Sequence, residues 1–190
     1  MLFRSSLCQR TIWLENGKIQ KNGDTNDVVN LYINKHFDNQ NSKMEWTNEN
    51  APGNEKVKIL SAEIADANDP QGTLFINRNL EFKIQIQNLS INNDFNISVH
   101  LFTLDDVHVM NIASPVLKPE KEFYTFKCII PENFLNDISY SVRIMIIESS
   151  KNIFTVDNIL AFEMHEDKRD VMWFGKWKGV VRPQLQWTIE

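Results

Sequence analysis

Cysteine and long apolar runs are scarce in this sequence of 190 residues. The two cysteines, Cys8 and Cys128, form no CxxC pair, which argues against a zinc site or a disulfide scaffold and suits a reducing compartment. No stretch reaches the roughly eighteen apolar residues that a membrane-spanning helix needs, and the N-terminus lacks the apolar core of a secretory signal. These absences predict a cytoplasmic protein that is neither exported nor embedded in a membrane.

Basic charge is also in short supply. The chain carries 20 Lys and Arg against 25 Asp and Glu, a net charge of -5, and its basic residues are scattered. Binding to a nucleic-acid backbone needs a clustered basic surface, so nucleic acid is not an expected partner. The apolar fraction of 42% is enough for one ordinary domain with an appendage.

Catalytic and metal-binding constellations are missing as well. Neighbouring carboxylates such as Asp105 and Asp106 lie on turns and form no facing pair of the kind that glycoside hydrolysis needs. His100 and His108 are placed to approach each other across a hairpin around these two residues, but two histidines without a third ligand make a poor metal site. We therefore predict no enzymatic activity, no cofactor and no metal.

Residues 1–37 read as a β-hairpin followed by a helix. The apolar run Ile12 to Leu14 precedes an Asn-Gly pair, which is the strongest short signal for a hairpin turn. Asp24 is a good helix cap, and the apolar residues that follow have helical spacing: Val28, Val29, Tyr32, Ile33 and Phe37. A hairpin and one helix bury little surface by themselves, so this segment is expected to dock on the following domain, a partner chain or a further domain.

Residues 38–54 have the polar composition of a linker, rich in Asn, Asp and Ser. Trp46 is the exception. It either pins the linker to the next domain, the preferred reading, or lies exposed for a ligand.

Residues 55–190 show the alternation of apolar and polar side chains that is typical of strands buried on one face. At least seven strands are predicted, around residues 57–64, 80–86, 97–101, 124–130, 140–146, 160–164 and 185–189. Turn-rich connections recur between them, and no long helical pattern intervenes. The expected fold is an all-β, antiparallel β-sandwich, either immunoglobulin-like or jelly-roll.

Two predicted strands carry an unusual outward face. Outward positions of residues 97–102 include His100 and Phe102, and those of residues 140–147 include Arg143 and Met145. Aromatic rings and planar polar groups are side chains that can bind sugars, and the family resemblance described at the end of this section makes these four candidate glycan-binding residues. Such an apolar outward face is more often a dimer interface or is covered by a loop or tail than it is a glycan contact, and plain surface is a third interpretation.

The C-terminal segment carries three of the five tryptophans. Trp187 alternates with Leu185 and Ile189, which predicts a core position. Trp173 and Trp177 lie among glycines and lysines in a loop-like stretch, where they either stack on sugar or cover the end of the sandwich. They complete the set of candidate glycan-binding residues.

The opening segment resembles the end of the ATPase domain of ABC exporters of bacterial surface polysaccharide. The resemblance rests on these residues: Leu7 to Arg10, Ile12 to Ile19, Gly23, Asp24, Asp27 to Val29 and Tyr32. The rest of the chain resembles the C-terminal carbohydrate-binding domain of Wzt-type O-antigen transporters, through these landmarks: Trp46, residues 51–54, Ile130 to Asn136, Tyr140, Gly179 to Val181 and Trp187.

The resemblance implies a non-catalytic domain that recognises lipid-linked O-antigen polysaccharide for export. It further implies a homodimer, and an association with the transporter's membrane subunit through an ATPase domain, at the cytoplasmic face of the inner membrane. The chain departs from the full ATPase, because it has no GxxxxGK[ST] loop, no LSGG stretch and no upstream histidine. It is therefore expected to be a non-ATPase piece, arising from an internal start, a split gene or a truncation. The alternatives are a sandwich that only self-associates, and a remnant subunit that joins a separate ATPase chain.

Overall fold

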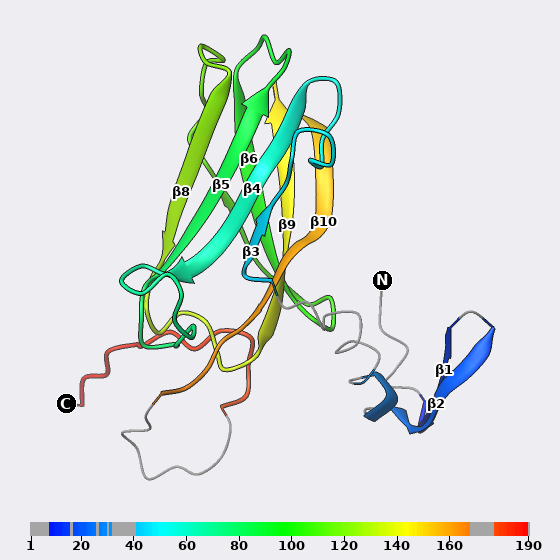
Figure 1. The fold of residues 1–190 in the computed structure, drawn as a ribbon. Helices are drawn as coiled ribbons and strands as arrows, with labels where there is room; N and C mark the ends of the chain where they lie inside the picture. Colours follow the sequence, from blue (N-terminus) through cyan, green and yellow to red (C-terminus); the bar gives the residue numbers. More distant parts are fainter. Residues whose placement is uncertain are drawn as a thin grey trace.

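The computed structural model describes residues 8–15, 17–25, 27–29, 31, 41–167 and 177–189. Most of this part of the chain is antiparallel β-structure, and the sandwich stands apart from an N-terminal hairpin (Figure 1). Among the described residues, no helix is long and apolar enough to cross a membrane.

The hairpin consists of β1 (Arg10–Glu15) and β2 (Lys18–Asp24), paired antiparallel. Gly17 has a φ of 75°, a left-handed conformation that glycine adopts without a steric penalty, so the predicted hairpin turn is confirmed. Residues 25, 27–29 and 31 are helical, and Val28 is buried. The later positions of the predicted helical stripe, Tyr32, Ile33 and Phe37, lie outside the described residues.

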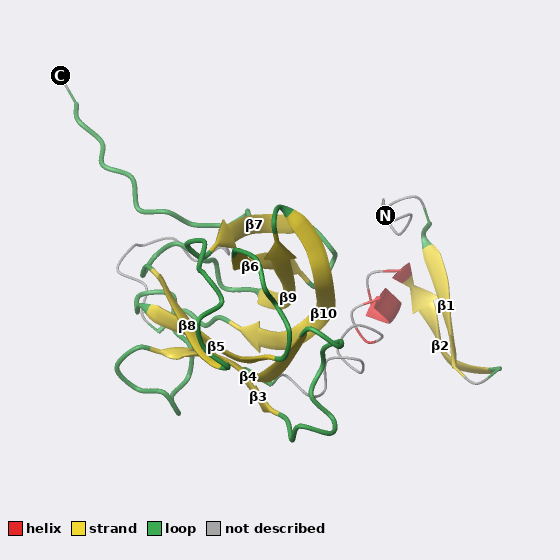
Figure 2. Ribbon diagram, turned by 90° about the horizontal axis from the view of Figure 1, so that it is seen from above, coloured by secondary structure: helices red, strands yellow, loops and turns green. Residues whose placement is uncertain are grey.

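The sandwich has two four-stranded sheets that pack face to face (Figure 2). One sheet has the order β3-β4-β5-β8, with bounds β3 (Lys43–Glu45), β4 (Val57–Asp66), β5 (Leu80–Asn88) and β8 (Phe123–Ile130). The other has the order β10-β9-β6-β7, with bounds β6 (Phe95–Thr103), β7 (His108–Ala113), β9 (Ser139–Glu148) and β10 (Lys151–Glu163).

The strand order decides between the two predicted topologies. The chain crosses from one sheet to the other after β5, β7 and β8, so that β8 pairs with β5 and β9 pairs with β6. In immunoglobulin nomenclature β4, β5 and β8 correspond to strands A, B and E, and β6, β9 and β10 correspond to C, F and G. The β7 strand extends the second sheet beside β6, and the fold is immunoglobulin-like.

The core lies between the sheets and is built by the inward positions of each strand. On β9 the inward side chains of Tyr140, Val142, Ile144 and Ile146 are at most 1% exposed, as their alternation predicts. Trp46 is half-buried and packs against this core, which confirms that it pins the preceding segment to the sandwich.

The sandwich also differs from the predicted strand list. The β3 strand, inside residues 38–54, pairs with β4 from Lys43 opposite Glu63, and β7 was not among the predicted strands. The final predicted strand is wrong, because residues 185–189 form no strand and Trp187 is 88% exposed. Alternation alone shows that a segment has an apolar side, but it does not show that the chain supplies a surface to cover that side.

A tyrosine corner lies at the end of the sandwich where the chain passes from β8 to β9. Tyr140, at the start of β9, accepts a hydrogen bond from the Asn136 amide at 2.8 Å, and its hydroxyl lies 2.9 Å from the Val180 carbonyl oxygen. The Asn136 side chain donates to the carbonyl oxygens of Trp177 and Gly179, at 2.9 and 2.7 Å. These contacts hold residues 177–181 against the connection between β8 and β9.

Candidate functional site

The two strands that carry four of the candidate residues are neighbours in one sheet. β6 and β9 are the inner strands of their sheet, and His100 pairs with Arg143 while Phe102 pairs with Ser141. Met145 pairs with Ser98 on the same outward face and is half-buried. The fold therefore brings four of the six candidate side chains together on one sheet. We call the surface of this sheet that points away from the core the outer face.

Phe102 is sandwiched between two polar groups. The guanidinium carbon of Arg143, on β9, lies 4.8 Å from the centre of the Phe102 ring. The His108 ring, on β7, is stacked on Phe102 with ring centres 4.8 Å apart. Because β9 and β7 lie on opposite sides of β6, these two groups approach Phe102 from opposite sides, and its ring faces are largely occupied.

A chain of hydrogen bonds runs across the outer face. The Ser98 hydroxyl donates to Asn111 Oδ1 at 3.0 Å and lies 3.1 Å from His100 Nε2. The other nitrogen of His100, Nδ1, lies 3.2 Å from His108 Nε2. The approach of the two histidines across the β6–β7 hairpin is the one that the sequence predicts.

The electrostatic environment keeps His100 neutral. Burial lowers the pKa of the His100 imidazole below its usual 6.5, and the neighbouring His108 and Arg143 lower it further. Arg143 Nε donates to the carboxylate of Asp157 on β10. Asp157 reaches Arg143 at an irregularity of β10, where the pairing with β9 shifts and Asn158 has a φ of 51°.

The remaining two candidates are not part of the outer face as described. Trp177 lies at the tyrosine corner, where the Arg182 guanidinium carbon is 5.0 Å from the centre of its ring. Arg182 in turn donates to Glu166 Oε1 at 2.7 Å, so Trp177 belongs to a local cluster that covers the end of the sandwich. Trp173 lies outside the described residues.

The described residues contain no group of three or more His, Cys, Asp or Glu side chains placed to hold a metal ion. His100 contacts Ser98 through Nε2 and His108 through Nδ1, so both nitrogens of His100 and the Nε2 atom of His108 serve the hydrogen-bond chain.

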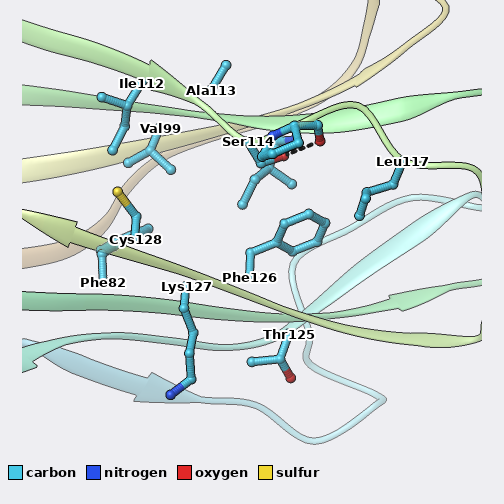
Figure 3. Close-up of a pocket in the computed structure, with 12 residues that line it drawn as sticks. Phe82, Val99, Ile112, Ala113, Ser114, Leu117, Thr125, Phe126, Lys127 and Cys128 are labelled. Carbon is cyan, nitrogen blue, oxygen red and sulfur yellow. Dashed lines mark hydrogen bonds between the residues drawn. The ribbon is translucent and has the colours of Figure 1, made fainter.

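A cavity of about 300 Å³ lies on the other side of this sheet, at the open edge of the sandwich between β8 and the β6–β7 hairpin (Figure 3). Its lining is mainly apolar and includes Val99, Ile112, Leu117, Phe126 and Cys128. Val99 is an inward residue of β6, so the cavity opens from the core side and is separate from the outer face.

Three contributors to the outer face are not predicted by the sequence pattern: His108, which the pattern indicates only as one of two histidines of a poor metal site, and Asn111 and Asp157. His108 and Asn111 lie on β7, whose pattern is blurred by the irregular pairing with β6 at Phe102. Asp157 reaches the face through the irregularity in β10. A hairpin prediction that included residues 108–113 as a strand would have found the first two.

Comparison with solved structures finds the crystal structure of the C-terminal domain of Wzt, with a TM-score of 0.55 and 14% sequence identity. The match covers 78% of this chain and 89% of that chain. The sandwich has the fold of the Wzt C-terminal domain. This likeness confirms the predicted all-β antiparallel sandwich and the expected resemblance to the Wzt domain, at the level of the fold.

A second match, to a candidate beta-galactosidase from Bacteroides fragilis, has a TM-score of 0.33 and 14% identity, and covers 54% of this chain and 15% of that chain. It is too distant to carry an argument beside the Wzt domain. No family model matches the chain, and a comparison with curated proteins likewise gives no match.

Proposed function

We propose that the sandwich is a non-catalytic glycan-recognition domain of a polysaccharide ABC exporter, with its binding surface on the outer face. One observation carries the proposal: on a Wzt-like fold, the neighbouring strands β9, β6 and β7 present an Arg, two His and a Phe as one contacting cluster. Guanidinium, imidazole and carboxylate groups pair with sugar hydroxyls, and ring surfaces pack on the C–H faces of sugars.

The arrangement favours polar contacts over stacking on Phe102. Arg143 and His108 occupy the two sides of that ring, so a sugar meets the edges of the cluster and the groups that flank it. Asp157 orients the Arg143 guanidinium through the bond to Nε. The mechanism is selective docking, in which several weak hydrogen bonds read a short stretch of glycan and a second copy of the domain multiplies the affinity.

The proposed setting follows from the same resemblance. The ligand is a lipid-linked O-antigen polysaccharide, and the domain works as a homodimer next to an ABC transporter's membrane subunit, which it reaches through an ATPase domain. The location is the cytoplasmic face of the inner membrane.

An NMR titration of the full 15N-labelled chain tests this proposal. The probes are polysaccharide from the source strain and an unrelated polysaccharide. The expected result is a set of shifts at the outer face, around His100 and Arg143, with the cognate glycan alone. Lys83 and Lys127, on the other sheet, are the internal control, and their resonances should not shift. Absence of shifts with both glycans, in a folded sample, overturns glycan recognition.

A second candidate function, self-association without glycan contact, is favoured by the C-terminal segment. Leu185, Trp187 and Ile189 are 71%, 88% and 100% exposed, although they alternate as the apolar side of a strand does. Burial of these three side chains against a second copy would remove a large apolar area from water, at about 25 cal/mol for each Å². The open, apolar edge beside β8 offers a surface of matching chemistry.

A further inference from the structure

We propose that His108 is the specificity-determining residue of the outer face, and that it reads a sugar hydroxyl with Nδ1 as a hydrogen-bond acceptor. This inference rests on the proposed glycan function. It follows from the direction of the hydrogen bonds that join Ser98, His100, His108 and Asn111.

The direction is set at the Asn111 end of the chain. Asn111 presents its carbonyl oxygen to Ser98, so the single proton of the Ser98 hydroxyl is donated to Asn111. Ser98 must then accept at its contact with His100 Nε2, which places the imidazole proton of His100 on Nε2. A neutral imidazole has one N–H and one acceptor nitrogen, so His100 Nδ1 is an acceptor.

The same reasoning fixes the tautomer of His108. Because His100 Nδ1 accepts, His108 donates through Nε2 across the 3.2 Å contact. Neutral His108 therefore carries its proton on Nε2 and has its acceptor lone pair on Nδ1. Within the described residues His108 Nδ1 has no hydrogen-bond partner, and the side chain is exposed.

The charges around the chain support this protonation state. The groups facing His100 are His108 from β7 and Arg143 from β9, and both disfavour a second positive charge there. Asp157, from β10, is engaged by Arg143. His100 thus stays a neutral acceptor and positions the His108 ring, while His108 is exposed and has an acceptor nitrogen left for a ligand.

A matched pair of substitutions separates the two nitrogens of His108. In His108→Gln the longer amide reaches the place of Nε2 and keeps a donor toward His100, but nothing replaces Nδ1. In His108→Asn the shorter amide offers its carbonyl oxygen near the place of Nδ1, but the bond to His100 is lost. Both variants remove the ring, so loss of stacking on Phe102 is common to them.

Affinity for the cognate polysaccharide is measured for the wild type and both variants in the full chain. We expect His108→Gln to lose about tenfold or more, equivalent to about 1.4 kcal/mol, and His108→Asn to retain more affinity than His108→Gln. Equal affinities of wild type and His108→Gln, or stronger binding by His108→Gln than by His108→Asn, overturn the inference while leaving glycan recognition intact. Failure of the wild type to bind overturns both.

A ligand-free measurement tests the tautomer directly. Imidazole 15N shifts of the wild type should show both His100 and His108 protonated at Nε2 and unprotonated at Nδ1. In His108→Gln the His100 shifts should persist, because the donor to Nδ1 is kept. A proton on Nδ1 of either histidine at neutral pH overturns the inference whatever the glycan result.

Discussion

The backbone amide of Asn136 donates to the hydroxyl oxygen of Tyr140 at 2.8 Å, and Tyr140 is fully buried. One side chain thereby fixes the connection between β8 and β9 at the point where the chain crosses from one sheet to the other. The same hydroxyl also lies 2.9 Å from the Val180 carbonyl oxygen, so the corner joins two stretches that lie far apart in the sequence. Burial raises the pKa of this hydroxyl to about 12, and it is protonated at all physiological pH values.

Removal of this hydroxyl should destabilise the whole domain. Tyr140→Phe leaves the Asn136 amide without its buried partner, and we expect a loss of about 1–3 kcal/mol in the free energy of unfolding, measured by urea denaturation. Tyr124→Phe is the matched control, since Tyr124 bonds Lys121 and Lys118 near the surface and should lose less. Equal losses in the two variants would contradict the role of the corner.

Glu148 should make the domain sensitive to acid. Its carboxylate is 5% exposed, lies 2.6 Å from Lys56 Nζ and accepts from the amides of Asn92 and Asn93. The Lys56 bond, followed by these amides, holds the pKa of Glu148 at about 2, against an ordinary value of 4.5. A depressed pKa stabilises the fold fully above pH 4.5, and this contribution is lost as the pH falls toward about 2.

The substitution Glu148→Gln isolates that contribution. We expect a loss of about 1–3 kcal/mol at pH 7, and the difference from wild type should shrink as the pH falls below 4.5. Glu81→Gln is the control, because its ion pair with Lys127 is at the surface and contributes about 0–1 kcal/mol. A difference between wild type and Glu148→Gln that is constant from neutral to acid pH would refute the assignment.

Arg143 should carry a large share of the glycan affinity. Arg143→Ala removes the guanidinium beside Phe102 and leaves Asp157 without its partner, so we expect about tenfold weaker binding of the cognate polysaccharide in isothermal titration calorimetry. Lys127→Ala, on the opposite sheet, should bind as the wild type does. Equal glycan affinity of Arg143→Ala and wild type would show that the binding site does not lie on the outer face.

The exposed C-terminal segment should control self-association. The double substitution Leu185→Ser with Trp187→Ser removes two of its three exposed apolar side chains and should convert a dimer to a monomer in sedimentation equilibrium. Leu89→Ser is the control, since Leu89 is also exposed, at 45%, but lies in a loop outside this segment. A wild type that is monomeric at all accessible concentrations, or a variant that remains dimeric, would exclude a role for the segment.

Much of the fold was readable from the sequence, because most of its strands have one buried face. Alternation located β4, β5, β6, β8 and β9, since apolar residues occupy every second position of each strand and point toward the core. It also placed His100 and Arg143 on the same outward face, which the pairing of β6 with β9 bears out. Alternation did not determine the topology, because the local spacing of apolar residues does not show which of the two sheets a strand joins.

The parts that the sequence missed depend on contacts between distant elements. The partnership of Asp157 with Arg143 needs the irregularity near Asn158, and the stacking of His108 on Phe102 needs the shifted pairing of β7. The predicted core position of Trp187 is wrong for the opposite reason. Its spacing is that of a core strand, but the described part of the chain holds no surface that covers it. The local sequence pattern identifies which side of a segment is apolar, and only the tertiary structure shows which part of the protein packs against that side.

The inner position of β6 and β9 separates the side chains of the proposed recognition surface from the side chains that hold the domain together. Their inward residues, such as Val99 and Ile144, build the core, while the alternate residues, such as His100 and Arg143, face outward and contribute little to it. Replacement of the outward set therefore leaves the packing between the sheets intact, whereas a one-residue insertion would exchange the two sets and destroy both. Such a frame can acquire a new ligand preference through a few alternating substitutions, without having to evolve a new fold.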